Sequence, residues 1–231
     1  MKRTVLSLLA FFIAMGAMAQ MIRSEEIEKY VHKKYGDRWQ DIAYYLSRDL
    51  ELDKNKSLTY VQIIDCPGKT SAQLYVALNH WFTTMFNDDR NNITLNDKQL
   101  GTIVGHGFVE GIANHTGGLN HYVVSIRPVI KADIKEGRVR VTYTLPYYSV
   151  SIVDGGGYLG TAFEDMRHPK PKDVYDVKWA IDECYPFVTK DSHKLTSSKA
   201  LVMSHAFSNI IIDRIEDAVK HGLIGNENDD W

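Results

Sequence analysis

Two stretches of the chain, 121–134 and 138–152, alternate apolar and polar residues. Strict alternation is typical of β-strands with one buried face, because successive side chains point to opposite sides. Between the two stretches, Glu136-Gly137 predicts a two-residue turn, since glycine tolerates the positive φ that such turns require. This turn sets a register in which Asp133 faces Arg140 and apolar residues face apolar ones. The predicted inward residues are Tyr122, Val124, Ile126, Ile130 and Ile134 on the first strand, and Val139, Val141, Tyr143, Leu145 and Tyr147 on the second.

The strongest helical pattern begins at Thr70. Its hydroxyl and the Gln73 amide form a capping box, in which each side chain satisfies a backbone N–H at the start of the helix. Apolar residues then recur at spacings of three and four, which is typical of a helix that packs one face on a core. The residues of this face are Leu74, Leu78, Trp81 and Met85.

Helices are also predicted near both ends of the chain. The pattern from Ser24 to Leu50 is helical and is interrupted once, at Gly36, so it predicts two short helices. Towards the C-terminus, a long amphipathic helix starts at Ser197 or Ser198 and ends at Gly222.

The segments between these elements predict shorter strands and loops. Leu58–Ile64, Ile93–Leu95 and Thr102–Phe108 are rich in β-favouring residues. In the last of these, the glycines at and beside the strand share one face, which indicates a bulge, or another backbone or an aromatic ring lying close over it. These glycines are Gly101, Gly105 and Gly107. We expect a loop at 114–118, irregular structure over 154–172 and a short helix within 174–184.

The N-terminus has the pattern of a cleavable secretory signal peptide. Lys2 and Arg3 precede an almost wholly apolar run, and Ala17-Met18-Ala19 supplies the small residues at a cleavage site, so we expect cleavage just before Gln20. The apolar run falls short of the roughly 20 residues that cross a bilayer. We therefore expect a soluble periplasmic or secreted protein that does not span the membrane.

Charge and cysteine content narrow the possible partners. Without residues 1–19, 25 basic residues stand against 29 acidic ones, a net charge of −4. This balance does not favour a nucleic-acid partner, which normally selects for a basic surplus. Cys66 and Cys184 are the only thiols. In an exported chain they are either a disulfide or two small buried side chains.

Four short motifs between 60 and 150 resemble an exported bacterial family of unknown function with a TATA-binding-protein-like fold. They are the helix start 71–75, the helix centre 79–82, the strand 101–105 and the hairpin residues 136–140. The resemblance implies a curved antiparallel sheet with helices on one face, within an α+β fold, and it implies no activity. The predicted organisation is a signal peptide at 1–19, a helical extension at 20–56, a TBP-like domain at 57–153, a connector at 154–195 and a helix with a polar tail at 196–231.

The polar face of the long hairpin is the candidate ligand surface. If its apolar face lies under the helices, the opposite face is either a solvated surface or a cationic groove for an acidic glycan, peptide or partner protein. The residues of this candidate face are His121, Ser125, Arg127, Lys131, Arg140, Thr142 and Thr144.

The sequence predicts neither a cofactor nor a metal. His106, Glu110, His115 and His121 lie in one region, but none of their spacings puts two ligands on one helix face, so we interpret them as surface residues. Two functional hypotheses remain open. One is a non-catalytic module that binds an envelope protein or glycan; the other is an exported hydrolase without a recognisable site motif.

Overall fold

The computed structural model describes six stretches of the chain. These are residues 22–36, 39–86, 89–117, 120–154, 174–187 and 194–222. The predicted signal peptide, most of the irregular connector and the polar tail lie outside the described residues.

A five-stranded antiparallel sheet is built around the predicted hairpin. Its strands are β1 (Leu58–Asp65), β2 (Asn92–Asp97), β3 (Thr102–His106), β6 (Val129–Lys135) and β7 (Arg138–Leu145), in the order β1-β7-β6-β3-β2. The predicted register is confirmed: Ile134 pairs with Val139 and Asp133 with Arg140. Gly137 has a φ of 68°, as the two-residue turn requires.

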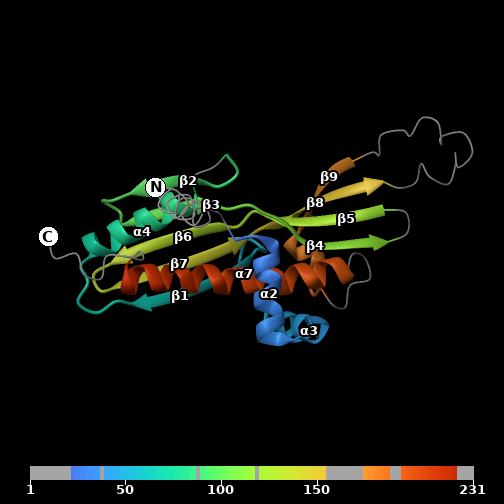
Figure 1. Cartoon of the computed structure of the whole chain (residues 1–231), viewed down its shortest axis with the longest axis horizontal. Helices are drawn as coiled ribbons and strands as arrows, with labels where there is room; N and C mark the ends of the chain where they lie inside the picture. The colour runs from blue at the N-terminus through green and yellow to red at the C-terminus, as the bar shows by residue number, and fades with distance from the viewer. Residues whose placement is uncertain are drawn as a thin grey trace, which may run out of the picture.

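The two chain segments that form β6 and β7 extend away from the turn into a second, four-stranded sheet. Its strands are β4 (Val109–Gly117), β5 (Asn120–Ile126), β8 (Tyr147–Asp154) and β9 (Val174–Ala180), in the order β4-β5-β8-β9. Figure 1 shows β5 leading into β6, and β7 leading into β8, in nearly the same direction. The α+β class with antiparallel sheets is therefore confirmed, with the strands divided between two sheets.

A bulge at Pro128 and Pro146 separates the two sheets. The last β6–β7 pair is Val129 with Thr144, and the nearest β5–β8 pair is Ile126 with Tyr148. The two residues between Ile126 and Val129 thus oppose the three residues between Thr144 and Tyr148. This difference of one residue reverses which side chains of the β7–β8 segment point inward. The prediction that Tyr147 points inward was therefore wrong. Instead the buried residues of β8 are Tyr148, Val150 and Ile152.

Helices cover the inner face of both sheets. α4 (Ser71–Met85) packs on the five-stranded sheet, and its predicted capping box is present, with Gln73 N donating to Thr70 Oγ1 at 3.2 Å. α7 (Lys194–His221) runs along both sheets (Figure 1). α2 (Ser24–Tyr35) and α3 (Trp39–Asp49) pack on α7, and the single-turn α6 (Ile181–Cys184) follows β9.

Two local predictions were wrong. Residues 114–117 continue β4 instead of forming a loop, because they pair with β5 up to Gly117 and Asn120. Residues 174–180 form β9 instead of a helix, and only 181–184 are helical. The pairing of β9 with β8 along its whole length decides its conformation. Local spacing does not report this long-range pairing.

The close approach predicted over the glycine face is confirmed at Gly105. A Cβ atom there would lie 2.9 Å from the Phe86 ring and 3.1 Å from the Phe82 ring. These two rings belong to α4 and the residue after it, and they stack on each other with centroids 5.3 Å apart. The absent side chain at Gly105 therefore lets α4 pack directly on β3.

Candidate functional site

The outer face of the five-stranded sheet is open, because the described helices pack on the opposite face. Three aliphatic side chains on it are largely exposed: Val61 at 56%, Ile63 at 55% and Leu95 at 42%. Val61 and Ile63 are neighbours on β1, whereas Leu95 lies on β2 at the opposite edge of the sheet. Neighbouring exposed apolar side chains are typical of interaction sites. This face is therefore the first place to look for a function.

A shallow hollow of about 130 Å³ lies at the hairpin end of this face. The pairing of the strands explains its composition. Ile63, Arg140 and Asp133 form one row across β1, β7 and β6, and Arg138 and Lys135 form the next row. The residues that line the hollow are Ile63, Asp133, Lys135, Arg138 and Arg140.

Asp133 is the acidic centre of the hollow and is held by three donors. It accepts hydrogen bonds from Arg140 Nη2 at 2.7 Å and Thr102 Oγ1 at 3.0 Å, and Lys131 Nζ lies 2.9 Å away. Burial opposes ionisation of this carboxyl group, but the three donors outweigh burial and lower its pKa. Arg140 and Lys131 thus both pair with Asp133, and the three groups together keep one net positive charge.

Lys135 and Arg138 supply further positive charge at the hollow, where Asp65 is the cross-strand neighbour of Arg138. Both side chains are exposed, they face each other across the end of the hairpin, and no ion pair to another described residue holds either of them. The neighbouring carboxylate of Glu136 is engaged elsewhere, because it accepts a hydrogen bond from Ser71 N at 2.9 Å at the start of α4. The hollow therefore offers two cations beside the aliphatic Ile63.

Residues 60–149 match the model of a family described as a domain of unknown function (DUF4468) with TBP-like fold. The expected family resemblance is confirmed. The DUF4468 segment runs from within β1 to within β8 and contains every residue that lines the hollow, whereas α2, α3 and α7 lie outside it. The family description assigns no activity.

Two solved structures are similar to this chain. A TBP-like protein from Parabacteroides distasonis shares 12% identity with a TM-score of 0.45, over 73% of this chain and 96% of that one. A DUF4468 family protein from Bacteroides ovatus shares 15% identity with a TM-score of 0.45, over 72% of this chain and 88% of that one. A comparison with curated proteins gives no match.

Four of the seven predicted ligand-face residues lie on the outer face of the DUF4468 sheet. Lys131 and Thr142 are direct cross-strand neighbours, and Arg140 lines the hollow. Thr144 is the fourth, and its hydroxyl accepts a hydrogen bond from Thr59 Oγ1 at 3.3 Å. The interpretation of this part of the hairpin as one polar face therefore agrees with the structure.

The other three predicted residues lie on or beside the four-stranded sheet. His121 is exposed and makes a 2.9 Å hydrogen bond with Thr116 Oγ1. Ser125 is buried and accepts a hydrogen bond from Gly111 N at 3.2 Å, so it is not available to a ligand. The Arg127 guanidinium lies 4.3 Å from the centroid of the Phe108 ring. The structure does not bring the seven residues into one groove.

The predicted ligand face left out four of the five residues that line the hollow, although the register had already placed Asp133 opposite Arg140. Lys135 and Arg138 continue the same alternation as Lys131 and Arg140, so extending the pattern to the turn finds them. Ile63 has no such signal. It comes from β1, and only the long-range pairing of β1 with β7 places it beside Arg140.

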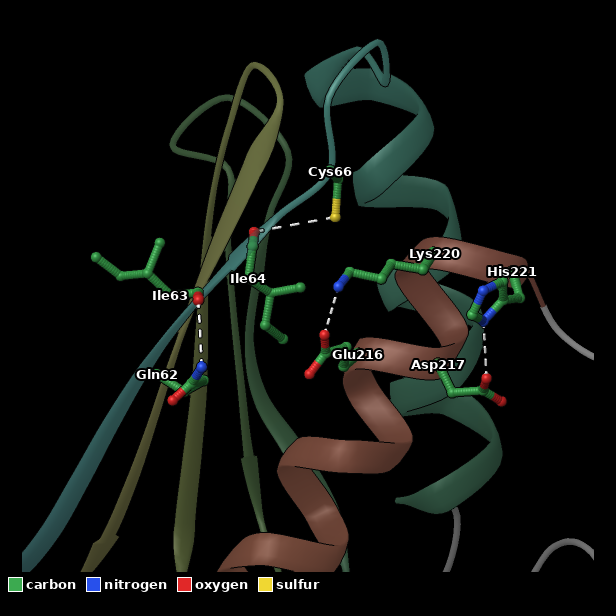
Figure 2. A network of polar contacts seen from close by, with 8 residues as sticks. All are labelled: Gln62, Ile63, Ile64, Cys66, Glu216, Asp217, Lys220 and His221. Atoms are coloured by element: carbon green, nitrogen blue, oxygen red, sulfur yellow. Dashed lines mark hydrogen bonds and ion pairs between the residues drawn. The ribbon is translucent and has the colours of Figure 1, made fainter.

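Cys66 and Cys184 are both buried and are not joined by a disulfide. Cys66 N donates to Gly137 O at the far end of β7, beside the last turns of α7 (Figure 2), whereas α6 starts at the other end of β7, where Ile181 N donates to Pro146 O. The nine steps along the chain from Gly137 to Pro146 span about 30 Å of strand. A disulfide needs Cα atoms within about 7 Å, so the disulfide alternative is wrong.

Three of the four residues in the possible metal region do not share a contact partner. Glu110 pairs with Arg90 at 3.2 Å, His121 bonds Thr116, and His106 is exposed at the end of β3. Within the described part of the chain, His, Cys, Asp and Glu residues form no group of three that would hold a metal ion.

A buried polar cluster lies under α7 where the two sheets meet. The Tyr60 ring contacts His205 with centroids 5.3 Å apart and Tyr143 at 6.0 Å. The hydroxyl of Tyr143 and Nδ1 of His205 are buried without a hydrogen-bond partner among the described residues. Burial, followed by the charge of Lys34, lowers the pKa of His205 to about 4, so its ring is neutral at pH 7.

Proposed function

We propose that this chain is an exported, non-catalytic binding module that holds an acidic segment of a cell-envelope protein on the open face of its five-stranded sheet. One observation carries the proposal. Lys135 and Arg138 have no ion-pair partner among the described residues and stand beside exposed Ile63. Two available cations next to an aliphatic side chain match a peptide that carries a carboxylate beside an apolar residue.

A protein partner fits this surface better than an acidic glycan. Val61 and Ile63 expose aliphatic groups, which gain free energy when another apolar side chain covers them. A glycan offers mainly hydroxyl groups to the same surface. Asp133 is already satisfied by its three donors, so it fixes the positions of Arg140 and Lys131 instead of repelling an acidic partner.

The hydrolase hypothesis requires a general acid or base in the site. Asp133 is the carboxyl group that lines the hollow, and its donors stabilise the ionised form and occupy its oxygens. Asp133 therefore gives the hydrolase hypothesis no support, and we do not carry that hypothesis further.

Export is part of this proposal and is supported by the N-terminal sequence pattern of Lys2, Arg3 and Ala17-Met18-Ala19. In the described residues, no helix is both long enough and apolar enough to cross a membrane. N-terminal sequencing of the protein from the extracytoplasmic fraction should start at or within a few residues of Gln20. A product that retains Met1 contradicts export.

Binding of the purified protein to isolated envelope fractions tests the surface. The double substitution Lys135→Glu and Arg138→Glu should abolish binding, and binding of the unmodified protein should weaken as salt rises. Lys29→Glu with Lys98→Glu is the matched control, because it changes the net charge equally at exposed sites outside the hollow. Binding lost equally in both double variants would reduce the effect to net charge and refute the proposed surface. Binding that glycosidase treatment removes and protease treatment spares would assign a glycan instead.

A further inference from the structure

α7 ends close to the turn between β6 and β7, and Lys69 joins the two. Lys69 Nζ donates to Val219 O and to Lys220 O, each at 2.7 Å. The carbonyl oxygen of Lys69 accepts a hydrogen bond from Gly137 N in the turn at 3.0 Å. Figure 1 shows the end of α7 and the β6–β7 turn at the same end of the structure. The chain therefore leaves α7 within the reach of one lysine side chain from this turn.

The basic residues at the end of α7 are already engaged. Two of them pair with carboxylates one turn earlier in the helix, namely Lys220 with Glu216 and His221 with Asp217 (Figure 2). Lys69 is held by the helix carbonyls. Lys135 and Arg138, by contrast, have no ion pair to another described residue. An acidic segment that leaves α7 therefore finds available cations at the hollow.

Residues 223–231, the acidic tail, follow α7 and have a charge that complements the hollow. The acidic tail contains three acidic residues, no basic residue and a tryptophan, which are Glu227, Asp229, Asp230 and Trp231. On β1, β6 and β7, the three rows of the outer face next to the turn carry four cations and two carboxylates, a net charge of 4 − 2 = +2. These residues are Lys131, Lys135, Arg138 and Arg140 against Asp65 and Asp133.

We infer that the acidic tail folds back past the β6–β7 turn and occupies the hollow as an internal ligand. Its carboxylates pair with Lys135 and Arg138. The Trp231 ring then covers Ile63, which is more than half exposed and points away from α7 (Figure 2). The nine residues span up to roughly 30 Å when extended, which is enough to pass from the end of α7 round the turn. The inference rests on the proposed function, because it gives the site of the acidic partner to the protein's own tail.

The order of residues in the acidic tail matches the order of rows in the hollow. Counted from the turn, the first row contains Lys135 and Arg138, and the second contains Ile63. Successive rows on one face of a strand are about 7 Å apart, which is also the distance between residues i and i+2 of an extended chain. Asp229 and Trp231 have this spacing. An extended tail therefore sets the Asp229 carboxylate on the cations while the Trp231 ring lies on Ile63.

The consequence is competition between the tail and the envelope partner. A tethered segment acts at an effective concentration in roughly the millimolar range, so it occupies the hollow even if its intrinsic affinity is weak. The apparent affinity for a partner then falls in proportion to the fraction of open sites. The protein therefore keeps its binding surface covered until a stronger acidic ligand displaces the tail.

Disulfide trapping in the intact chain tests the contact without any partner. Oxidation of Ile63→Cys with Trp231→Cys should link the two cysteines within one copy, as peptide mapping without reductant detects. Val76→Cys with Trp231→Cys is the matched control, because Val76 is 67% exposed on α4, which packs on the opposite face of the sheet. This pair should stay unlinked. No link in the first variant, equal linking in both, or a link between two copies overturns the inference.

Binding to isolated envelope fractions tests the competition. The neutralised tail, Glu227→Gln with Asp229→Asn and Asp230→Asn, should bind about tenfold more tightly, because the hollow is then open. The control removes three charges at exposed sites outside the hollow, by Glu25→Gln, Glu51→Gln and Asp89→Asn, and should leave binding unchanged. Equal binding of the two triple variants overturns the inference.

The two experiments separate this inference from the proposed function. A trapped tail without any envelope binding would refute the proposed partner and support the tail contact. Envelope binding that depends on Lys135 and Arg138, in a protein whose tail cannot be trapped, would refute the tail contact alone.

Discussion

The neutral, buried His205 should make this protein lose stability in mildly acidic solution. His205 lies on α7 against the Tyr60 ring, and its Nε2 is 3.2 Å from Asn209 Nδ2. Burial and, secondarily, Lys34 lower its pKa to about 4 from an ordinary value of about 6.5. As the pH falls, His205 therefore binds a proton at a higher pH in the unfolded chain than in the folded chain. Its contribution to stability is complete above pH 6.5 and is lost as the pH falls towards 4.

The size of this loss follows from the two pKa values. Between pH 8 and pH 5, proton binding to the unfolded chain should lower the free energy of unfolding by about 2 kcal/mol. pH 5 is the informative value, because ordinary carboxyl groups titrate below it. The lowered pKa of Asp133 keeps that carboxylate ionised at pH 5 as well.

Urea denaturation of the protein and of His205→Leu at pH 8 and pH 5 measures the effect. The variant should lose about 2 kcal/mol less than the unmodified protein over this interval, whatever its stability at pH 8. His106→Leu is the control, because His106 is exposed at the end of β3, and it should keep the full pH dependence. Equal losses in the unmodified protein and in His205→Leu would refute the placement of a neutral imidazole under α7.

Three further substitutions test the packing through thermal or urea unfolding. Gly105→Ala places a Cβ 2.9 Å from the Phe86 ring and should cost about 1–3 kcal/mol, with part of the loss recovered by Phe86→Leu. Gly137→Val puts a β-branched residue at a φ of 68° and should cost about 1 kcal/mol or more, whereas Arg140→Ala at an exposed ion pair should cost less. Tyr143→Phe removes a buried hydroxyl without a partner in the described residues and should stabilise the protein by about 1 kcal/mol.

Each of these has an outcome that contradicts it. Full stability in Gly105→Ala would mean that α4 does not lie against β3. A larger loss in Arg140→Ala than in Gly137→Val would overturn the turn and the register together. A destabilised Tyr143→Phe would show that the hydroxyl has a hydrogen-bond partner.

Features set by neighbouring residues could be predicted from the sequence. The β6–β7 register follows from one turn and two alternating strands, because a slip of one residue would expose every apolar side chain. The capping box at Thr70 depends on a spacing of three residues. The prediction that another group lies close over the glycine face at Gly105 was also correct, although the sequence did not identify Phe82 and Phe86 as the rings that cover it.

Features set by distant pairing could not be predicted in the same way. Residues 174–180 are compatible with helix or strand, and β8 decides between them. The reversal of the buried face at Tyr148 depends on one extra residue opposite Pro128, which alternation along one strand does not show. Pro146 marks this place in the sequence, because proline is confined to sheet edges, strand starts and bulges.

The candidate site shows the same division between local and distant information. Alternation placed Lys131 and Arg140 on one face, but it did not show that Asp133 would pair with both of them. The cations without an ion-pair partner among the described residues lie nearer the turn, at Lys135 and Arg138, and the apolar wall comes from Ile63 on a strand about 70 residues away in the chain. The binding surface therefore depends on the β1–β7 pairing.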